Sequence, residues 1–302
     1  MKLLLIVNAA ASSVTDRGKV VIAKALAADH DLEVVETDHR NHATKLAADA
    51  AADGFDAVVA FGGDGTLNEA ANGVAGTDTA LAVLPGGSTN VFARTIGMPN
   101  DAVEATGALL EALAADRTER IGVGVVNGRR FLFHVGVGFD AAVVEQVERR
   151  APLKRYASHP LFVYSAFTTW FLHYDRLRPR FEVDGEPASF MIVLNSSPYT
   201  YLGNRPLDLL PEATLDTPLC AVRFKTMGMA PLLQTVGAAL AGRDARRSKH
   251  LDIRTDVREL EVRADRPFPY QVDGDYVGEA SALSFRHEPE AVRFIVPAGR
   301  TG

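Results

Sequence analysis

The chain has 302 residues, of which 47% are hydrophobic and 23% are charged, and its formal net charge is −6. This length allows one large domain or two of ordinary size, and the acidic balance argues against a generally basic nucleic-acid surface. The single cysteine, Cys220, excludes an intramolecular disulfide, and no Cys/His zinc spacing occurs, so we expect a protein of the reducing cytoplasm.

The apolar run at 1–8 is too short for a signal peptide, and polar residues follow it closely. We therefore expect this run to form the first strand. No stretch approaches the roughly 18 uninterrupted apolar residues that a membrane span requires. The sequence thus predicts no membrane-spanning helix.

The first third of the chain alternates between short apolar runs and amphipathic segments. This alternation is typical of a parallel sheet covered by helices on both faces. Ligands in such sheets bind at the carboxyl ends of the strands. Strands are expected at 3–7, 32–37, 57–61 and 80–84, and helices at 19–28, 42–52 and 102–114, with a further helix that follows the glycine-rich turn and runs through Gly73.

After residue 119 the pattern changes to strands separated by turn signals. The dipeptides Asn127-Gly128, Asp184-Gly185 and Asp273-Gly274 are strong hairpin signals. We expect an α/β domain at 1–119 and a mainly antiparallel β-sandwich domain at 120–302, whose last strand is free to return to the first domain. Strands are expected at 120–126, 130–135, 180–183, 190–194, 219–224, 259–262, 270–272, 282–286 and 292–296, and helical segments around 140–174 and 230–240.

Two glycine-rich turns follow the third and fourth predicted strands. Residues 62–69 read GGDGTLNE, and residues 85–94 read PGGSTNVFAR. Backbone N–H groups in such turns can approach a phosphate closely because no Cβ intervenes, and the following helix N-terminus adds positive partial charge. Asp64 would repel a phosphate unless a cation lay between them. The first turn therefore suggests a metal–nucleotide complex.

Each turn also has a purely structural interpretation. Ser88 or Thr89 can cap a helix, and Asp64 can make a local Asx bond. Two such turns after strands adjacent in sequence favour ligand binding, since neighbouring strands place the turns side by side. Neither a P-loop nor a Rossmann glycine fingerprint in the first strand–helix turn is present.

In combination, the two turns resemble the catalytic-domain family of diacylglycerol kinases, sphingosine kinases and bacterial lipid kinases. Further segments fit this family in the right order: Asn8 after the first strand, GVGFDA at 136–141, the stretch 203–216, and VDGD at 272–275. The resemblance implies ATP-dependent phosphorylation of a lipid hydroxyl with Mg²⁺, with diacylglycerol or a related lipid of phospholipid metabolism as the acceptor. It also implies an active site in the cleft between the two domains.

The resemblance assigns roles to individual residues. Asp275 stands where the family has the glutamate proposed as general base, and Asp64 would act in catalysis and hold the metal. Asp216 stands in the family's structural metal site. The residues implied to bind the nucleotide and its phosphates are Asn8, Ser12, Thr37, Gly62, Gly63, Asp64, Gly65, Thr66, Asn68, Glu69, Gly87 and Ser88.

The chain departs from the family pattern at several acids. Val91, Gly122 and Thr217 each replace a carboxylate, and Asp275 is one methylene shorter than glutamate. These losses leave open a catalytically weakened regulator that binds nucleotide or lipid. An NAD kinase is the other alternative, since NAD kinases share a Gly-Gly-Asp-Gly-Thr turn.

A basic segment at 149–155 precedes an aromatic-rich segment at 160–174, and a second basic stretch lies at 243–249. Basic residues beside aromatics suit an anionic membrane surface, although a buried helix with a solvated basic lead-in explains the same pattern. We therefore expect a lipid substrate, peripheral membrane contact and no nucleic-acid partner. Whether the chain forms a homodimer is left open.

Overall fold

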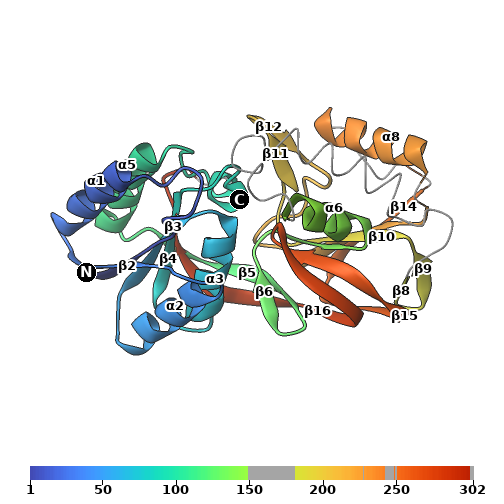
Figure 1. The fold of residues 1–302 in the computed structure, drawn as a ribbon, viewed down its shortest axis with the longest axis horizontal. Coiled ribbons are helices and arrows are strands. Elements are labelled where there is room, and N and C mark those ends of the chain that lie inside the picture. Colours follow the sequence, from blue (N-terminus) through green and yellow to red (C-terminus); the bar gives the residue numbers. More distant parts are fainter. Residues whose placement is uncertain (149–180, 227, 242–247, 249, 300–302) are drawn as a thin grey trace. The chain divides into compact units, whose positions relative to one another are not determined.

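A computed structural model describes residues 1–148, 181–226, 228–241, 248 and 250–299 (Figure 1). The predicted basic and aromatic segments at 149–155 and 160–174, and most of the basic stretch at 243–249, lie outside the described residues. The chain divides into two compact units, Met1–Val123 with Pro289–Gly302, and Gly124–Glu288.

The first unit is built on a parallel sheet with the strand order β4-β3-β1-β2. Strands β1, β3 and β4 are buried almost throughout, whereas the edge strand β2 is largely exposed. Phe294, near the end of β16, pairs in parallel with Leu81 of β4. The strands are β1 (Lys2–Val7), β2 (Asp31–Glu36), β3 (Ala57–Gly62) and β4 (Ala80–Pro85).

Helices cover both faces of this sheet. Helices α1 and α5 pack together on one face, and α2 and α3 pack together on the other (Figure 1). The chain runs from β1 out to β2 and then returns to β3, so the sheet has a topological switch point between β1 and β3. The helices are α1 (Asp16–Ala27), α2 (His42–Ala52), α3 (Asp64–Val74), α4 (Val91–Thr95) and α5 (Ala102–Ala114).

The second unit is mainly antiparallel, with neighbouring strands in the order β14-β13-β10-β7-β15-β16. Together with the parallel sheet of the first unit, this confirms the predicted fold class. The elements are β5 (Thr118–Val126), β6 (Arg129–Phe131), β7 (His134–Val137), α6 (Phe139–Glu148), β8 (Phe181–Val183), β9 (Glu186–Ala188), β10 (Phe190–Leu194), β11 (Thr200–Leu202), β12 (Arg205–Leu207), β13 (Leu219–Phe224), α8 (Met229–Leu240), β14 (Leu251–Val257), β15 (Glu259–Val272) and β16 (Asp275–Ile295).

All three dipeptide hairpin signals are confirmed. They connect β5 to β6, β8 to β9 and β15 to β16. Both central residues of each turn have positive φ, for example 48° at Asp273 and 80° at Gly274, as type I′ hairpin turns require. The single strand predicted at 130–135 is wrong, because this segment forms two strands, β6 and β7, with a break at Leu132–Phe133.

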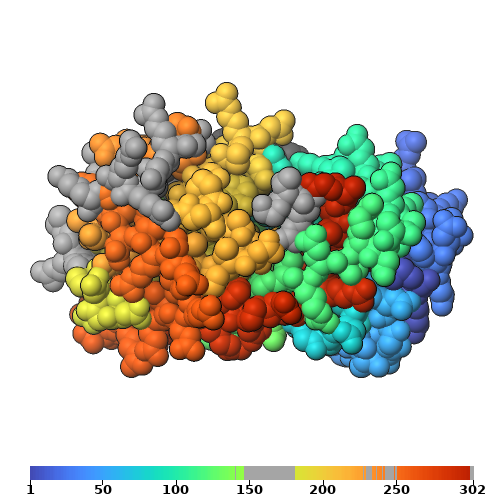
Figure 2. All heavy atoms as spheres, turned by 180° about the vertical axis from the view of Figure 1, so that it is seen from behind, coloured from blue at the N-terminus to red at the C-terminus, as the bar shows by residue number. Residues whose placement is uncertain are grey.

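Both faces of the central strand β10 are buried. Phe190, Ile192 and Leu194 join one apolar cluster with α6, and Met191 and Val193 join another with β8 and β15. Strand β15 alternates between buried and exposed residues over its first part. Figure 2 shows residues of this part of the chain, in orange, on the surface of the unit.

Among the helices that the structure describes, none combines the length and the apolar character needed to cross a lipid bilayer.

Candidate active site

The two glycine turns of the first unit touch through their backbones. The N–H of Gly86 donates to the carbonyl of Gly62 at 2.7 Å. A Cβ atom added to Gly87 would lie 2.8 Å from the Cα of Gly63, closer than van der Waals contact allows. Gly87 is therefore required for the turns to pack against each other, in addition to any role in approaching a ligand.

Asp64 fastens the first turn to the second. Its Oδ2 accepts a hydrogen bond from the N–H of Val91 at 3.0 Å, and its Oδ1 accepts one from the N–H of Phe92 at 3.1 Å. These N–H groups open α4, whose own N-cap residue, Asn90, makes no side-chain cap. Asp64 thus caps α4 from another segment of the chain.

The N-terminus of α3 has a different environment. Its N-cap residue is Gly63, which has no side chain to accept a hydrogen bond, and the first helical bond runs from the N–H of Leu67 to the carbonyl of Gly63. The N–H groups of the first turn of a helix have no partner inside the helix. Those of α3 combine with the positive end of the helix dipole, which is the ordinary setting for a phosphate.

The turn after β1 supports both glycine turns. Asn8 Nδ2 donates to the hydroxyl of Thr66 at 2.9 Å, and Asn8 Oδ1 accepts from the N–H of Ala10. Ser12, the predicted nucleotide ligand, is exposed. The neighbouring Ser13 instead contacts the second turn, since its N–H donates to the Gly86 carbonyl and its hydroxyl to the Gly87 carbonyl.

The carboxylate of Glu69, which the resemblance assigns to phosphate or metal, caps α2. It accepts hydrogen bonds from the N–H groups of Asn41 at 2.8 Å and Ala43 at 3.2 Å. Helix α2 lacks a side-chain cap of its own, because Asn41 adopts a left-handed conformation without capping. The partners of this carboxylate are therefore backbone groups of the protein.

The other residues predicted to bind the nucleotide differ in exposure: Asn68 is buried in α3, and the rest are at least partly accessible to solvent. Asn68 is buried, and its carbonyl accepts from Asn72 Nδ2. Thr37 is half-buried directly after β2, and its N–H donates to the Val7 carbonyl. Gly65 is half-buried in the first turn of α3, and Ser88 is exposed in the second glycine turn.

The β15–β16 hairpin of the second unit carries two acids in different environments. Asp273 is 3% exposed. Its carboxylate accepts three backbone hydrogen bonds, from Leu132 at 2.7 Å, Phe133 at 3.0 Å and His134 at 3.1 Å. These bonds hold the break between β6 and β7. The sequence predicts only a turn at Asp273, because no residue pattern predicts hydrogen-bond partners that are distant in the sequence.

Asp275, the predicted general base, lies across the hairpin from Val272 and is half-buried. Within the described residues, its carboxylate has no hydrogen-bond or ion-pair partner. An acid in this state has its lone pairs available for an incoming hydroxyl group.

His134 lies beside the backbone that Asp273 holds. Burial lowers the pKa of His134 from 6.5 to about 3, and its ring packs 4.4 Å from that of Tyr199, measured between centroids. The imidazole is therefore neutral at physiological pH.

Asp216, the predicted structural metal ligand, is exposed in the segment before β13. The neighbouring Thr217, which replaces a family carboxylate, uses its hydroxyl in a local turn with Thr214. In the part of the chain that the structure describes, Asp216 belongs to no group of three potential metal ligands. A metal site with three His, Cys, Asp or Glu ligands is thus not formed around it among the described residues.

Comparison with known proteins places these features in context. The family of the diacylglycerol kinase catalytic domain matches residues 2–126. A "Probable lipid kinase YegS-like" of Pseudomonas aeruginosa (strain UCBPP-PA14) is 30% identical over 288 residues, covering 93% of this chain and 90% of the relative.

Solved structures share the fold. A diacylglycerol kinase from Bacillus anthracis str. Sterne covers 99% of this chain and 98% of its own, with a TM-score of 0.71 and 21% identity. An NAD kinase from Archaeoglobus fulgidus, solved in complex with ATP, covers 99% of this chain and 95% of its own, with a TM-score of 0.55 and 14% identity.

Proposed function

Since the chain belongs to the lipid kinase family of the diacylglycerol kinase catalytic domain, we propose that it transfers the γ-phosphate of ATP to a hydroxyl of diacylglycerol or a closely related lipid. The observation that carries the proposal is the N-terminus of α3, which follows a glycine turn and has no side-chain cap. This terminus offers N–H donors and positive partial charge to a phosphate chain.

The residues present fit ATP with Mg²⁺. The first-turn N–H groups of α3, with Gly63 and Gly65, would hold phosphate oxygens, and the exposed hydroxyls of Ser12 and Ser88 would add donors. Asp64, whose oxygens accept the N–H groups of Val91 and Phe92, would hold the cation through its carboxylate, which has about four lone-pair sites in all. Mg²⁺ is commonly held by one or two carboxylates together with substrate phosphates. When bound, the complex supplies the transferable phosphoryl group.

Asp275 is our proposed general base. Its carboxylate would take the proton of the lipid hydroxyl while the lipid oxygen bonds to the γ-phosphorus and the bond to the ADP oxygen breaks. The lack of a partner for this carboxylate among the described residues supports the assignment. Phosphoryl transfer needs little more from the protein than positioning and charge neutralisation.

The lipid that accepts the phosphoryl group determines where the protein binds its substrate. Diacylglycerol, a sphingoid base and a glycolipid each present a hydroxyl next to apolar chains, so the chain must approach a membrane surface from one side. Peripheral membrane contact in the cytoplasm is therefore part of the proposal. The diacylglycerol kinase catalytic domain that matches residues 2–126 favours diacylglycerol as the first acceptor to assay.

The test is a transfer assay with the purified full chain, radiolabelled ATP and Mg²⁺. Vesicles containing diacylglycerol, sphingosine or a glycolipid are assayed in parallel with NAD. We expect label in diacylglycerol, and a loss of transfer with Asp275→Asn. The matched control Glu279→Gln removes an exposed acid of the same hairpin and should transfer at the wild-type rate.

Two outcomes would overturn the proposal. Label in NAD and in none of the lipids would assign the chain to the NAD kinases. ATP binding without transfer to any acceptor would assign it to a regulator that has lost catalysis.

A further inference from the structure

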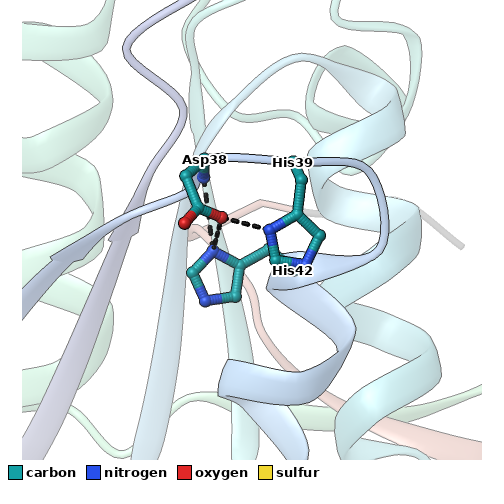
Figure 3. A group of neighbouring side chains, drawn as sticks. All are labelled: Asp38, His39 and His42. Carbon is teal, nitrogen blue, oxygen red and sulfur yellow. Dashed lines mark hydrogen bonds and ion pairs between the residues drawn. The ribbon is translucent and has the colours of Figure 1, made fainter.

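Three potential metal ligands converge in the loop between β2 and α2. One ligand atom from each of Asp38, His39 and His42 lies within 4.8 Å of the other two. Figure 3 shows the three side chains directed toward one another. Asp38 Oδ1 lies 2.7 Å from His42 Nδ1 and also contacts His39 Nδ1. The imidazole rings stack with centroids 4.6 Å apart.

The backbone that carries these ligands is held in place at both ends. Before the loop, the N–H of Thr37 donates to the carbonyl of Val7 in β1. After it, Glu69 binds the N–H groups of Asn41 and Ala43. Asn41 has a φ of 65°, a left-handed conformation that asparagine tolerates better than most residues. This turn brings His42, the first residue of α2, next to Asp38.

Two imidazole nitrogens and one carboxylate oxygen form a donor set of intermediate softness. Such sets suit Zn²⁺, Co²⁺ and Ni²⁺, whereas Mg²⁺ prefers oxygen ligands alone. Asp38 and His39 have side chains 73% and 65% exposed, and that of His42 is 18% exposed. An ion can therefore reach the group from solvent, and water can complete its coordination.

We propose that Asp38, His39 and His42 bind a divalent transition-metal ion, with Zn²⁺ as the representative. The proposal does not depend on the lipid kinase activity, because the three residues lie outside the glycine turns and the β15–β16 hairpin. Without a metal, the same geometry would be a carboxylate that hydrogen-bonds to His39 and lies against His42, whose Nδ1 accepts from the N–H of Asp38 at 3.2 Å. The two interpretations differ in whether the group binds an ion, which can be measured.

The test is calorimetric titration of the full chain, free of any histidine tag, with Zn²⁺ in the absence of nucleotide. We expect saturable binding of one equivalent that millimolar Mg²⁺ does not displace. His39→Ala and Asp38→Asn should each raise the Kd about tenfold or more, the scale expected even when a residue that only hydrogen-bonds to a metal ligand is changed. His250→Ala removes a histidine of the second unit and should leave the Kd unchanged.

A second readout uses Co²⁺, whose visible absorption reports coordination by nitrogen and oxygen. The absorption bands should appear with the wild type and weaken in His39→Ala. His42 is mostly buried, so His42→Ala could lose structure, and the two variants of exposed residues decide the question. Absence of saturable Zn²⁺ binding, or a Kd equal to that of wild type in both variants, would overturn the proposal.

Discussion

The first glycine turn and the β15–β16 hairpin each place an acid next to glycine, yet they use these acids differently. In the turn, both oxygens of Asp64 accept backbone N–H groups of α4. In the hairpin the two tasks are divided: Asp273 accepts three backbone N–H groups, and Asp275 is left without a partner among the described residues.

This difference distinguishes a carboxylate with a structural role from one that is available for catalysis. A carboxylate that accepts several backbone N–H groups stabilises the backbone geometry that it binds. A carboxylate without protein partners adds nothing comparable to the fold and is available to a substrate. Asp273 and Asp275 therefore represent the two extremes, and Asp64 must serve both purposes if it also contacts a metal.

The largest effect is expected at Asp275. Asp275→Asn should lower kcat about 100- to 10,000-fold, the usual contribution of a general base, while the free energy of unfolding stays within about 0.5 kcal/mol of wild type. Asp275→Glu restores the family residue and should retain activity. Steady-state lipid phosphorylation and urea denaturation measure the two quantities. An unchanged kcat in Asp275→Asn would remove the general base from this hairpin.

The next effect is expected at Asp273. Asp273→Ala leaves three buried N–H groups without acceptors, so the free energy of unfolding should fall by about 3 kcal/mol or more. Asp184→Ala is the matched control, because Asp184 occupies the same turn position of the β8–β9 hairpin with a side chain 41% exposed. It should cost about 1 kcal/mol. Equal losses in urea denaturation would mean that turn conformation, and not the three bonds, sets the stability.

A smaller loss of stability than that of Asp273→Ala is expected at Asp64. Asp64→Ala should cost about 1 to 2 kcal/mol, like the loss of an N-cap. Asp101 is an ordinary N-cap in the same unit, accepting from the N–H groups of Val103 and Glu104, so Asp101→Ala should cost a similar amount. Of these two variants, only Asp64→Ala should lower the rate of lipid phosphorylation. If the two variants retain equal activity, Asp64 is a cap and has no part in the chemistry.

Local signals made much of the fold predictable. Helices at 42–52 and 102–114 were predicted with the observed bounds, and the three hairpins follow from two residues each. Strands β9, β11, β12 and β14 were missed, since they are short or rich in charged residues. The long strands β15 and β16 were predicted in pieces, because polar residues on their exposed faces interrupt the apolar alternation.

The candidate site was predictable only in part. The glycine turns could be predicted from their composition. The hydrogen-bond partners of Asp64, Glu69 and Asp273 could not. Each of these acids binds backbone N–H groups of a segment distant in sequence, and every residue except proline offers such a group. The Asp38, His39 and His42 group contains no cysteine, so it does not match a Cys/His zinc spacing.

The hydrogen bond between Asp64 and the N–H of Val91 bears on whether the glycine-turn motif can be used to predict kinase activity. Because the bond ends on the main chain, any residue except proline at position 91 can maintain it, including the valine that replaces an acid here. A descendant that lost kinase activity would still need Asp64 and Gly87 to assemble the two turns. The glycine-turn motif, the most recognisable segment of this sequence, is thus evidence for the fold. Evidence for catalytic activity has to come from acidic residues that the fold does not require.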